Sequence, residues 1–212
     1  MTATNLKLLA CFLMLVDHIG YVLFPDVVVL RLVGRFSFPI FAWLLVEGFR
    51  HTHDLPLYGL RLLGLGIVSQ PIYYRITQSF NLNILFTLAL GLLLLRLAEI
   101  NNYGKTLIYL FVILSLAISD SIPLEYGSYG LTLILLIALE LPLELNLICW
   151  FILHLLAARI VWPLQFFAFF TVFLLMMSKG ESGTKLPKYL FYGFYPIHLG
   201  CLYFLKQQIL GS

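Results

Sequence analysis

Hydrophobic residues occur in long runs along the whole chain, and polar residues gather in the short stretches between them. A helix needs about 20 residues to cross a bilayer, and shorter tilted or buried helices also occur. We therefore predict nine apolar helices, near residues 6–24, 28–49, 57–75, 82–99, 105–119, 128–141, 144–160, 163–178 and 189–208. Pro142 leaves a second option open, because it could kink one longer helix and reduce the count to eight.

Composition assigns these runs to a membrane. Hydrophobic residues make up 61% of the chain and charged residues 11%, which is too few polar groups to cover a water-soluble globule of 212 residues. We expect an all-α, polytopic integral membrane bundle of about 8–9 transmembrane helices, forming one domain over residues 1–212. The expected surrounding partner is the lipid bilayer, and no nucleic acid is expected.

Charge and cysteine usage refine this picture. Most Lys and Arg residues fall at the inner helix ends if the N-terminus is cytosolic, so the positive-inside rule favours that orientation. The first apolar run has no small-residue cleavage pattern after it, and we expect it to be a retained helix. The three cysteines lie in apolar runs without ligand spacing, and "HTHD" after the second run resembles an interfacial loop more than a metal site.

Ionisable residues inside the first two runs are the main candidates for chemistry. Asp17 and His18 interrupt "LKLLACFLMLVDHIGYVLF", and Arg35 lies inside the second run. His18 and Arg35 lie about 9–10 Å below the outer helix ends, so all three residues can meet at one level. Such groups are unfavourable in hydrocarbon and usually face the bundle interior, so we expect a functional role for them.

Helical geometry separates Asp17 from His18. Neighbouring residues on a helix point about 100° apart, so the carboxylate cannot easily orient the adjacent imidazole. Arg35 is the natural partner for Asp17, which leaves His18 available for proton chemistry. Lys7 lies on the same helix face as His18, about 16 Å away along the axis. A lysine there could hold a carrier phosphate, or it could be an ordinary interfacial anchor.

Further polar residues converge on the same outer half. Gln70, Asn83 and Thr87 lie at that depth, as does the stretch "EYGSYG" at residues 125–130, and His198 follows Pro196 in the last helix. Together with Ser37 they form the predicted substrate pocket. The predicted pocket residues are Ser37, Gln70, Asn83, Thr87, Tyr126, Tyr129 and His198.

Structural interpretations of these residues stay open. Gln70 could satisfy a carbonyl freed by Pro71, and His198 could simply be bonded beside the Pro196 kink. His154 is more typical of a packed histidine bonded to a neighbouring helix. Two further local features are expected in the second run: an interruption at Pro39, and a pairing of Glu47 with His51.

Five stretches carry a family resemblance: "LKLLACFLMLVDHIG", "GRFSFPIFAWLLVEGFRHT", "NILFTLALG", "YGSYG" and "FYPIHL". In this order they resemble the TraX family of bacterial membrane proteins, whose founding member is associated with N-terminal acetylation of conjugative pilin. That family is similar to wider classes of transmembrane acyltransferases, some of which have a basic residue, ten intervening residues and a catalytic histidine in the first helix. Lys7 and His18 match this spacing, with Lys in place of the more familiar Arg.

The resemblance implies a function and a location. His18 would be a general base, Lys7 a contact for the carrier phosphate and Arg35 a pocket residue, in a multi-pass protein of the bacterial inner membrane. The implied donor is acetyl-CoA or another acyl-CoA, without a metal. The acceptor, a pilin-like peptide N-terminus, a glycan or a small molecule, stays open. The alternatives are a small proton or solute transporter that uses the same polar cluster, and a non-catalytic scaffold.

Overall fold

The chain is helical throughout the part that the structure describes. The computed structural model describes residues 1–100, 123–178, 183–184 and 187–210. Apart from an isolated bridge between Leu82 and Leu124, the regular elements in these ranges are helices. They are α1 (Ala3–Val22), α2 (Val28–Gly34), α3 (Ser37–His51), α4 (Leu55–Thr77), α5 (Ile84–Ile100), α7 (Gly127–Ala138), α8 (Leu143–Ile160), the 3-10 helix η2 (Pro163–Phe170), α9 (Thr171–Met176) and α10 (Lys188–Leu210).

The apolar runs and the helices coincide closely, with one predicted helix, 105–119, lying outside the described residues. The sixth and seventh runs form two helices, α7 and α8. Glu140 between them has a φ of 48°, and Pro142 is the N-cap residue of α8. A proline at a helix start lacks only an N–H that has no partner within the helix, so Pro142 begins α8 and does not kink a longer helix.

The second run is divided one turn earlier than predicted. We expected the interruption at Pro39, but Pro39 is the third residue of α3, where its missing N–H breaks no helical bond. The break falls at Arg35 and Phe36, between α2 and α3. A proline ring clashes with the carbonyl group four residues before it, which here is the carbonyl of Arg35. Pro39 therefore prevents α2 from continuing past Arg35, although the proline itself lies one turn later, inside α3.

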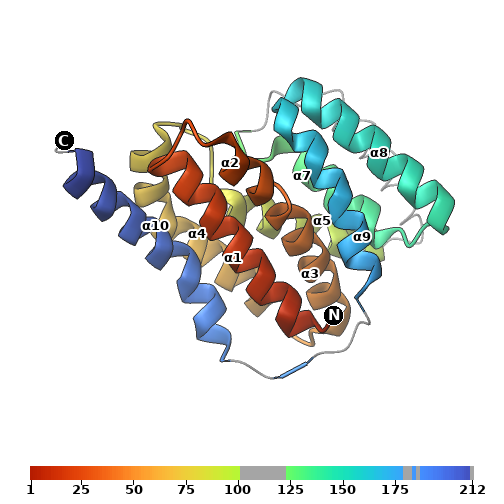
Figure 1. Cartoon of the computed structure of the whole chain (residues 1–212). Coiled ribbons are helices and arrows are strands. Elements are labelled where there is room, and N and C mark those ends of the chain that lie inside the picture. Colours follow the sequence, from red (N-terminus) through yellow and green to blue (C-terminus); the bar gives the residue numbers. More distant parts are fainter. Residues whose placement is uncertain (101–122, 179–182, 185–186, 211–212) are drawn as a thin grey trace.

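Helix α1 lies between two groups of helices (Figure 1). It packs against α2 and α3 on one side and against α10 on the other, and α10 packs in turn on α4. Helices α3 and α5 pack on α7, and α8 packs on η2. Leu6 and Ala10 of α1 and Ile40 of α3 are fully buried. The C-terminal part of α1, with Asp17 and His18, therefore has α2 and α10 as neighbours.

Two helical segments of the described chain are long and apolar enough to cross a membrane, Ala3–Val22 and the combined Val28–His51. Two shorter apolar helical segments, Gly127–Ala138 and Pro163–Met176, fall below that length. The larger number of crossings expected from the apolar runs stays a prediction.

Candidate functional site

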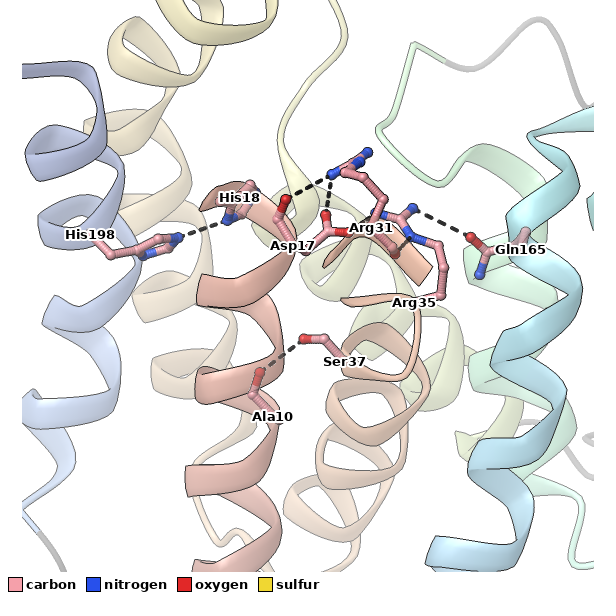
Figure 2. A network of polar contacts seen from close by, with 8 residues as sticks. All are labelled: Ala10, Asp17, His18, Arg31, Arg35, Ser37, Gln165 and His198. Atoms are coloured by element: carbon pink, nitrogen blue, oxygen red, sulfur yellow. Dashed lines mark hydrogen bonds and ion pairs between the residues drawn. The ribbon is translucent and has the colours of Figure 1, made fainter. Parts of the chain in front are cut away.

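Asp17 joins two arginines of α2. Its Oδ2 lies 2.5 Å from Arg31 Nη1 and its Oδ1 lies 2.5 Å from Arg35 Nη2 (Figure 2). All three side chains are largely buried, with 17% of Arg31, 11% of Asp17 and 8% of Arg35 exposed. The predicted contact between Asp17 and Arg35 is thus present, and Arg31, four residues before Arg35, approaches from the same face of α2. One carboxylate is shared between two guanidinium groups.

Gly34 allows α1 and α2 to approach closely enough for this arrangement. A Cβ atom added to Gly34 would lie 2.2 Å from Cβ of Asp17. Real Cβ atoms do not come that close, and the Cβ of Asp17 is fixed to the backbone of α1. Any larger residue at position 34 must therefore push the two helices apart at the level of the carboxylate.

Gly34→Ala should lower the free energy of unfolding by about 1–3 kcal/mol, because overpacking at this contact displaces α1 from α2. The matched control is Gly64→Ala in α4, where an added Cβ meets nothing within 4 Å. That change should raise stability by about 0.5–1 kcal/mol, the usual gain from replacing a helical glycine. Thermal unfolding of both variants in detergent, followed by circular dichroism, measures the difference. Equal stabilities would contradict the close approach at Gly34.

Aromatic rings surround the two guanidinium groups. The Trp162 ring centroid is 5.2 Å from Cζ of Arg31 and 5.3 Å from Cζ of Arg35, and the Tyr21 ring is 4.9 Å from Cζ of Arg31. A cation over a ring face is stabilised by the ring quadrupole, more strongly when water is excluded. Arg31 and Arg35 are therefore held by Asp17 and by the rings together.

A directed chain of hydrogen bonds leads from Arg35 into α7 and α8. Arg35 Nη1 donates to Gln165 Oε1 at 3.5 Å, and Gln165 Nε2 donates to the Tyr129 hydroxyl at 2.9 Å. Nδ1 of His154 lies 2.7 Å from the Trp150 carbonyl, which only accepts, so Nδ1 carries the proton. His154 Nε2 then accepts from the Tyr129 hydroxyl at 3.2 Å. The prediction of a packed His154 bonded to a neighbouring helix is confirmed.

His18 has its partner on α10 (Figure 2). Its Nδ1 lies 2.8 Å from Nε2 of His198, and Nδ1 of His198 lies 2.7 Å from the carbonyl oxygen of Phe194. Both imidazoles are buried, the Phe194 ring stacks on His198 at 4.7 Å, and Tyr195 meets both imidazoles edge-on. As the helical geometry predicts, Asp17 turns to α2 while His18 turns to α10, so the two neighbours have separate partners.

Gln70 and Asn83 form a separate group that fastens α4 to the start of α5. Gln70 Oε1 accepts from the backbone N–H and from Nδ2 of Asn83, at 3.0 and 2.8 Å, and Gln70 Nε2 donates to the carbonyl of Asn81. Asn83 Nδ2 also donates to the carbonyl of Gly66. The suggestion that Gln70 satisfies a carbonyl freed by Pro71 is wrong, because its amide bonds the turn after α4 instead.

The other predicted pocket residues are dispersed. Ser37 Oγ donates to the Ala10 carbonyl at 3.0 Å, and Tyr126 stacks on Phe38 with ring centroids 4.0 Å apart. The Thr87 hydroxyl is buried and has no hydrogen-bond partner among the described residues. Of the seven residues predicted to share one pocket, His198 contacts His18 and Tyr129 belongs to the hydrogen-bond chain from Arg35. The seven residues do not form one group.

A cavity of about 470 Å³ lies along the N-terminal half of α1. Lys7, Cys11 and Met14, spaced by one helical turn each, form one wall. The remaining walls come mainly from α3, α4, α5 and α10 and are mostly apolar. The acidic and basic side chains in the lining are Lys7, Glu47, His51 and Arg61. The seven predicted pocket residues all lie in the described part of the chain, and none of them lines this cavity. Their role as a substrate pocket stays a prediction.

Opposite charges meet beside residues that line this cavity. Glu47 Oε1 lies 3.0 Å from Arg50 Nη1, and its Oε2 lies 3.8 Å from Nδ1 of His51, so the expected pairing of Glu47 with His51 is present. Arg50 Nη2 also lies 2.9 Å from Glu140. Nζ of Lys7 lies 5.8 Å from the centroid of the Phe191 ring.

Several residues of the site were not found from the sequence. Arg31 and Gln165 complete the network around Asp17, and the hydroxyl of Tyr195, which lines the cavity, has no hydrogen-bond partner among the described residues. Glu125, by contrast, belongs to the predicted polar stretch at residues 125–130. It precedes α7 and accepts from the backbone N–H of Ile84 at 2.8 Å, and desolvation by burial raises its pKa to about 7. An i, i+4 pair of arginines and a single glutamine in the aromatic run "PLQFFAFF" were the available signals.

Comparison with known proteins agrees with the resemblance seen in the motifs. A probable fimbrial assembly protein FimC, serogroup H1, from Dichelobacter nodosus is 29% identical over 95% of this chain and 94% of its own length. An uncharacterised protein of Rickettsia prowazekii (strain Madrid E) is 35% identical over 41% of this chain and 33% of its own length. No solved structure matches the chain. The family model described as TraX protein matches residues 2–206, and the chain therefore belongs to the TraX family.

Proposed function

We propose that this protein is a membrane-embedded acyltransferase that moves an acyl group, acetyl in the simplest case, from cytosolic acyl-CoA to an acceptor amine or hydroxyl. The observation that carries the proposal is the cavity on α1. It extends from Lys7 to Met14, and His18 lies one further turn along the same helix face. A cationic end, apolar walls and a buried imidazole beyond them are what an acyl-CoA thioester requires from a protein.

The exposed surface supports a polytopic arrangement in lipid. Helix α8 presents Leu145, Ile148, Phe151, Ile152 and Leu155 on one continuous face, and each of these side chains is 42–55% exposed. The 18-residue helix is about 27 Å long, close to the hydrocarbon thickness, and this face covers about 15 Å of it. Apolar surface on this scale is typical of contact with lipid and not with water. We place the N-terminus, and with it the Lys7 end of the cavity, on the cytosolic side, as the positive-inside rule favours.

The cavity suits the donor in size and in charge. Its volume of about 470 Å³ falls within the usual range for small-molecule sites. Lys7 and Arg61 supply positive charge for phosphate oxygens, while Glu47 is paired with Arg50. The distance from Lys7 to His18 along the helix, about 16 Å, lets an extended pantetheine arm bring the thioester near the imidazole.

The proposed chemistry uses His18 as general base and Arg35 as an oxyanion stabiliser. His18 takes the proton of the acceptor N–H or O–H while the acceptor atom bonds to the acyl carbon. The carbon–sulfur bond then breaks, and the proton passes from His18 to the departing thiolate. Arg35 uses three of its five N–H groups for Asp17, Gln165 and the Arg31 carbonyl. Its remaining donors, or backbone amides nearby, would hold the oxyanion.

The family and its relatives bear on the acceptor. The relative from Dichelobacter nodosus has a name that refers to fimbrial assembly. Together with membership of the TraX family, this makes the N-terminal amine of a pilin-like peptide one acceptor to test. A glycan hydroxyl and a small amine are the other two, because the chemistry at His18 is the same for all of them.

Met14→Trp should raise the KM for acetyl-CoA about tenfold or more, because the indole fills part of the cavity and removes at least 1.4 kcal/mol of donor binding. The measurement is release of the free CoA thiol from acetyl-CoA by purified protein in nanodiscs, with water, a peptide amine or an amino sugar as acceptor. The matched control is Phe12→Trp on the same helix, where the side chain is 60% exposed and faces away from the cavity. Phe12→Trp should leave the KM unchanged.

Three results would contradict the proposal. A wild-type protein that releases no thiol from acetyl-CoA with any of the three acceptors would exclude acyl transfer from this donor. Solute counterflow in proteoliposomes without consumption of acyl-CoA would assign the polar cluster to transport instead. Equal KM values for the two tryptophan variants would show that the donor binds elsewhere.

A further inference from the structure

The hydrogen bonds around His198 determine which of its nitrogens carries a proton. The Phe194 carbonyl oxygen, 2.7 Å from Nδ1 of His198, can only accept, so Nδ1 must be an N–H. In the neutral ring Nε2 then holds the lone pair. Nδ1 of His18 lies 2.8 Å from this Nε2 and must donate to it, so His18 carries its own proton on Nδ1. The lone pair of His18 is left on Nε2.

We infer that His198 is a positioning residue that holds His18 in the Nδ1–H tautomer, so that Nε2 of His18 is the atom that accepts the acceptor's proton. This inference rests on the proposed function for its catalytic meaning, but the tautomer itself does not. A neutral imidazole in water favours the other tautomer, so the arrangement needs a partner that accepts from Nδ1. In this protein the partner is a second histidine and not a carboxylate.

Asp17 cannot serve as that partner, although it is the adjacent residue. Both of its carboxylate oxygens are bonded to arginines of α2, each at 2.5 Å. The packing around His198 also fixes its ring, because Phe194 stacks on it with an interplanar angle of 18° and Tyr195 crosses it at 67°. The acceptor lone pair is thus held by α10 and aimed at α1.

The pair also accounts for the positive charge that catalysis creates. When Nε2 of His18 receives the proton of the acceptor, the imidazolium keeps its Nδ1–H on the lone pair of His198, and that bond becomes charge-assisted. Proton transfer from Nε2 to the thiolate restores the neutral pair. His198 ends each cycle with the protons with which it began, so it orients and stabilises His18 without being consumed.

NMR of ring-nitrogen-labelled histidine tests the inference without any substrate. The chain has five histidines, and single substitutions assign their signals. His154 and His198 should both be Nδ1–H tautomers, because each bonds a backbone carbonyl through Nδ1. The inference requires that His18 show the same pattern. A wild-type His18 in the Nε2–H tautomer would overturn it.

Two variants of His198 then separate positioning from packing. His198→Gln keeps an acceptor oxygen near the place of Nε2 and should retain the Nδ1–H signal of His18. His198→Phe keeps a ring but removes the acceptor, so the His18 signal should move toward the other tautomer while that of His154 stays. With acetyl-CoA as donor, kcat should fall roughly 10- to 100-fold in His198→Phe, with little change in KM, and less in His198→Gln.

The outcomes can be told apart. An unchanged His18 tautomer in a folded His198→Phe protein would overturn the inference, and so would equal rates for the two variants. If the wild type shows the predicted tautomer but does not use acetyl-CoA, the proposed function fails and the positioning of His18 by His198 stands. If His198→Phe does not fold, the wild type and His198→Gln still decide the tautomer.

Discussion

Replacement of Asp17 by leucine is expected to lower the free energy of unfolding by about 3–5 kcal/mol. The variant leaves Arg31 and Arg35 side by side in a largely buried site without their shared carboxylate. A buried charge that loses its partner keeps its desolvation penalty, and here two like charges also face each other. Reversible unfolding in detergent with increasing denaturant measures this loss of stability, which arises from the unpaired charges of Arg31 and Arg35.

Glu99→Leu in α5 is the matched control. Arg96 Nη1 and Glu99 Oε2 are also 2.5 Å apart, but the two side chains are 50% and 54% exposed. Solvent screens such a pair, so this variant should lose less than about 1 kcal/mol. A triple variant that places leucine at positions 17, 31 and 35 should recover much of the loss, because no charge is left unpaired. Equal losses for the two single variants would contradict a stabilising role for the buried cluster.

Helix positions were predictable because each apolar run must be removed from water over its whole length, either in the protein core or in lipid. The runs at 6–24 and 57–75 correspond to α1 and α4 within a few residues. The division of the second run was displaced by one turn, because the clash of Pro39 acts on the carbonyl four residues earlier and not at the proline itself. Such a displacement follows from the geometry of the helix and could have been anticipated.

Contacts between helices were predictable only where two quantities agreed: the depth of each residue along its helix and the direction in which its side chain points. Asp17 and Arg35 share a level, and the angle between neighbouring residues excluded His18 as the partner of Asp17. Arg31 was not predicted as a partner of Asp17. It lies one helical turn before Arg35, yet the length of its side chain lets it reach the same carboxylate. Reach, as well as depth, decides which charges meet.

Lateral position could not be obtained from depth. Gln70 and Asn83 were predicted to lie in the same outer half as His18, but they bond each other where α4 meets the start of α5. Gln165 lies in an apolar and aromatic segment without any charge, and only the packing of η2 near α2 brings it to Arg35. A sequence gives height along a helix, while the order of helices around the bundle depends on their packing.

Asp17 and His18 are neighbours in the sequence, but they have different roles in the fold and in the proposed chemistry. Asp17 fastens α1 to α2, and His18 contacts α10, so loss of stability and loss of catalysis can be separated by single substitutions. A change at position 18 leaves the Asp17 ion pairs in place. This separation makes His18 the position at which the proposed chemistry can be tested most directly.

His18→Ala should lower kcat for transfer from acetyl-CoA by about 10²- to 10⁴-fold, the contribution usual for a general base. The KM for acetyl-CoA should change little, because His18 does not line the donor cavity. His53→Ala is the control, since His53 is exposed in the loop before α4 and has no part in the proposed chemistry. His18→Ala also removes a buried imidazole and its bond to His198, so it should lower the free energy of unfolding by about 1–3 kcal/mol, less than Asp17→Leu does. Full turnover in a folded His18→Ala protein would remove this residue from the reaction, and an unchanged kcat with a raised KM would move it from proton transfer to binding.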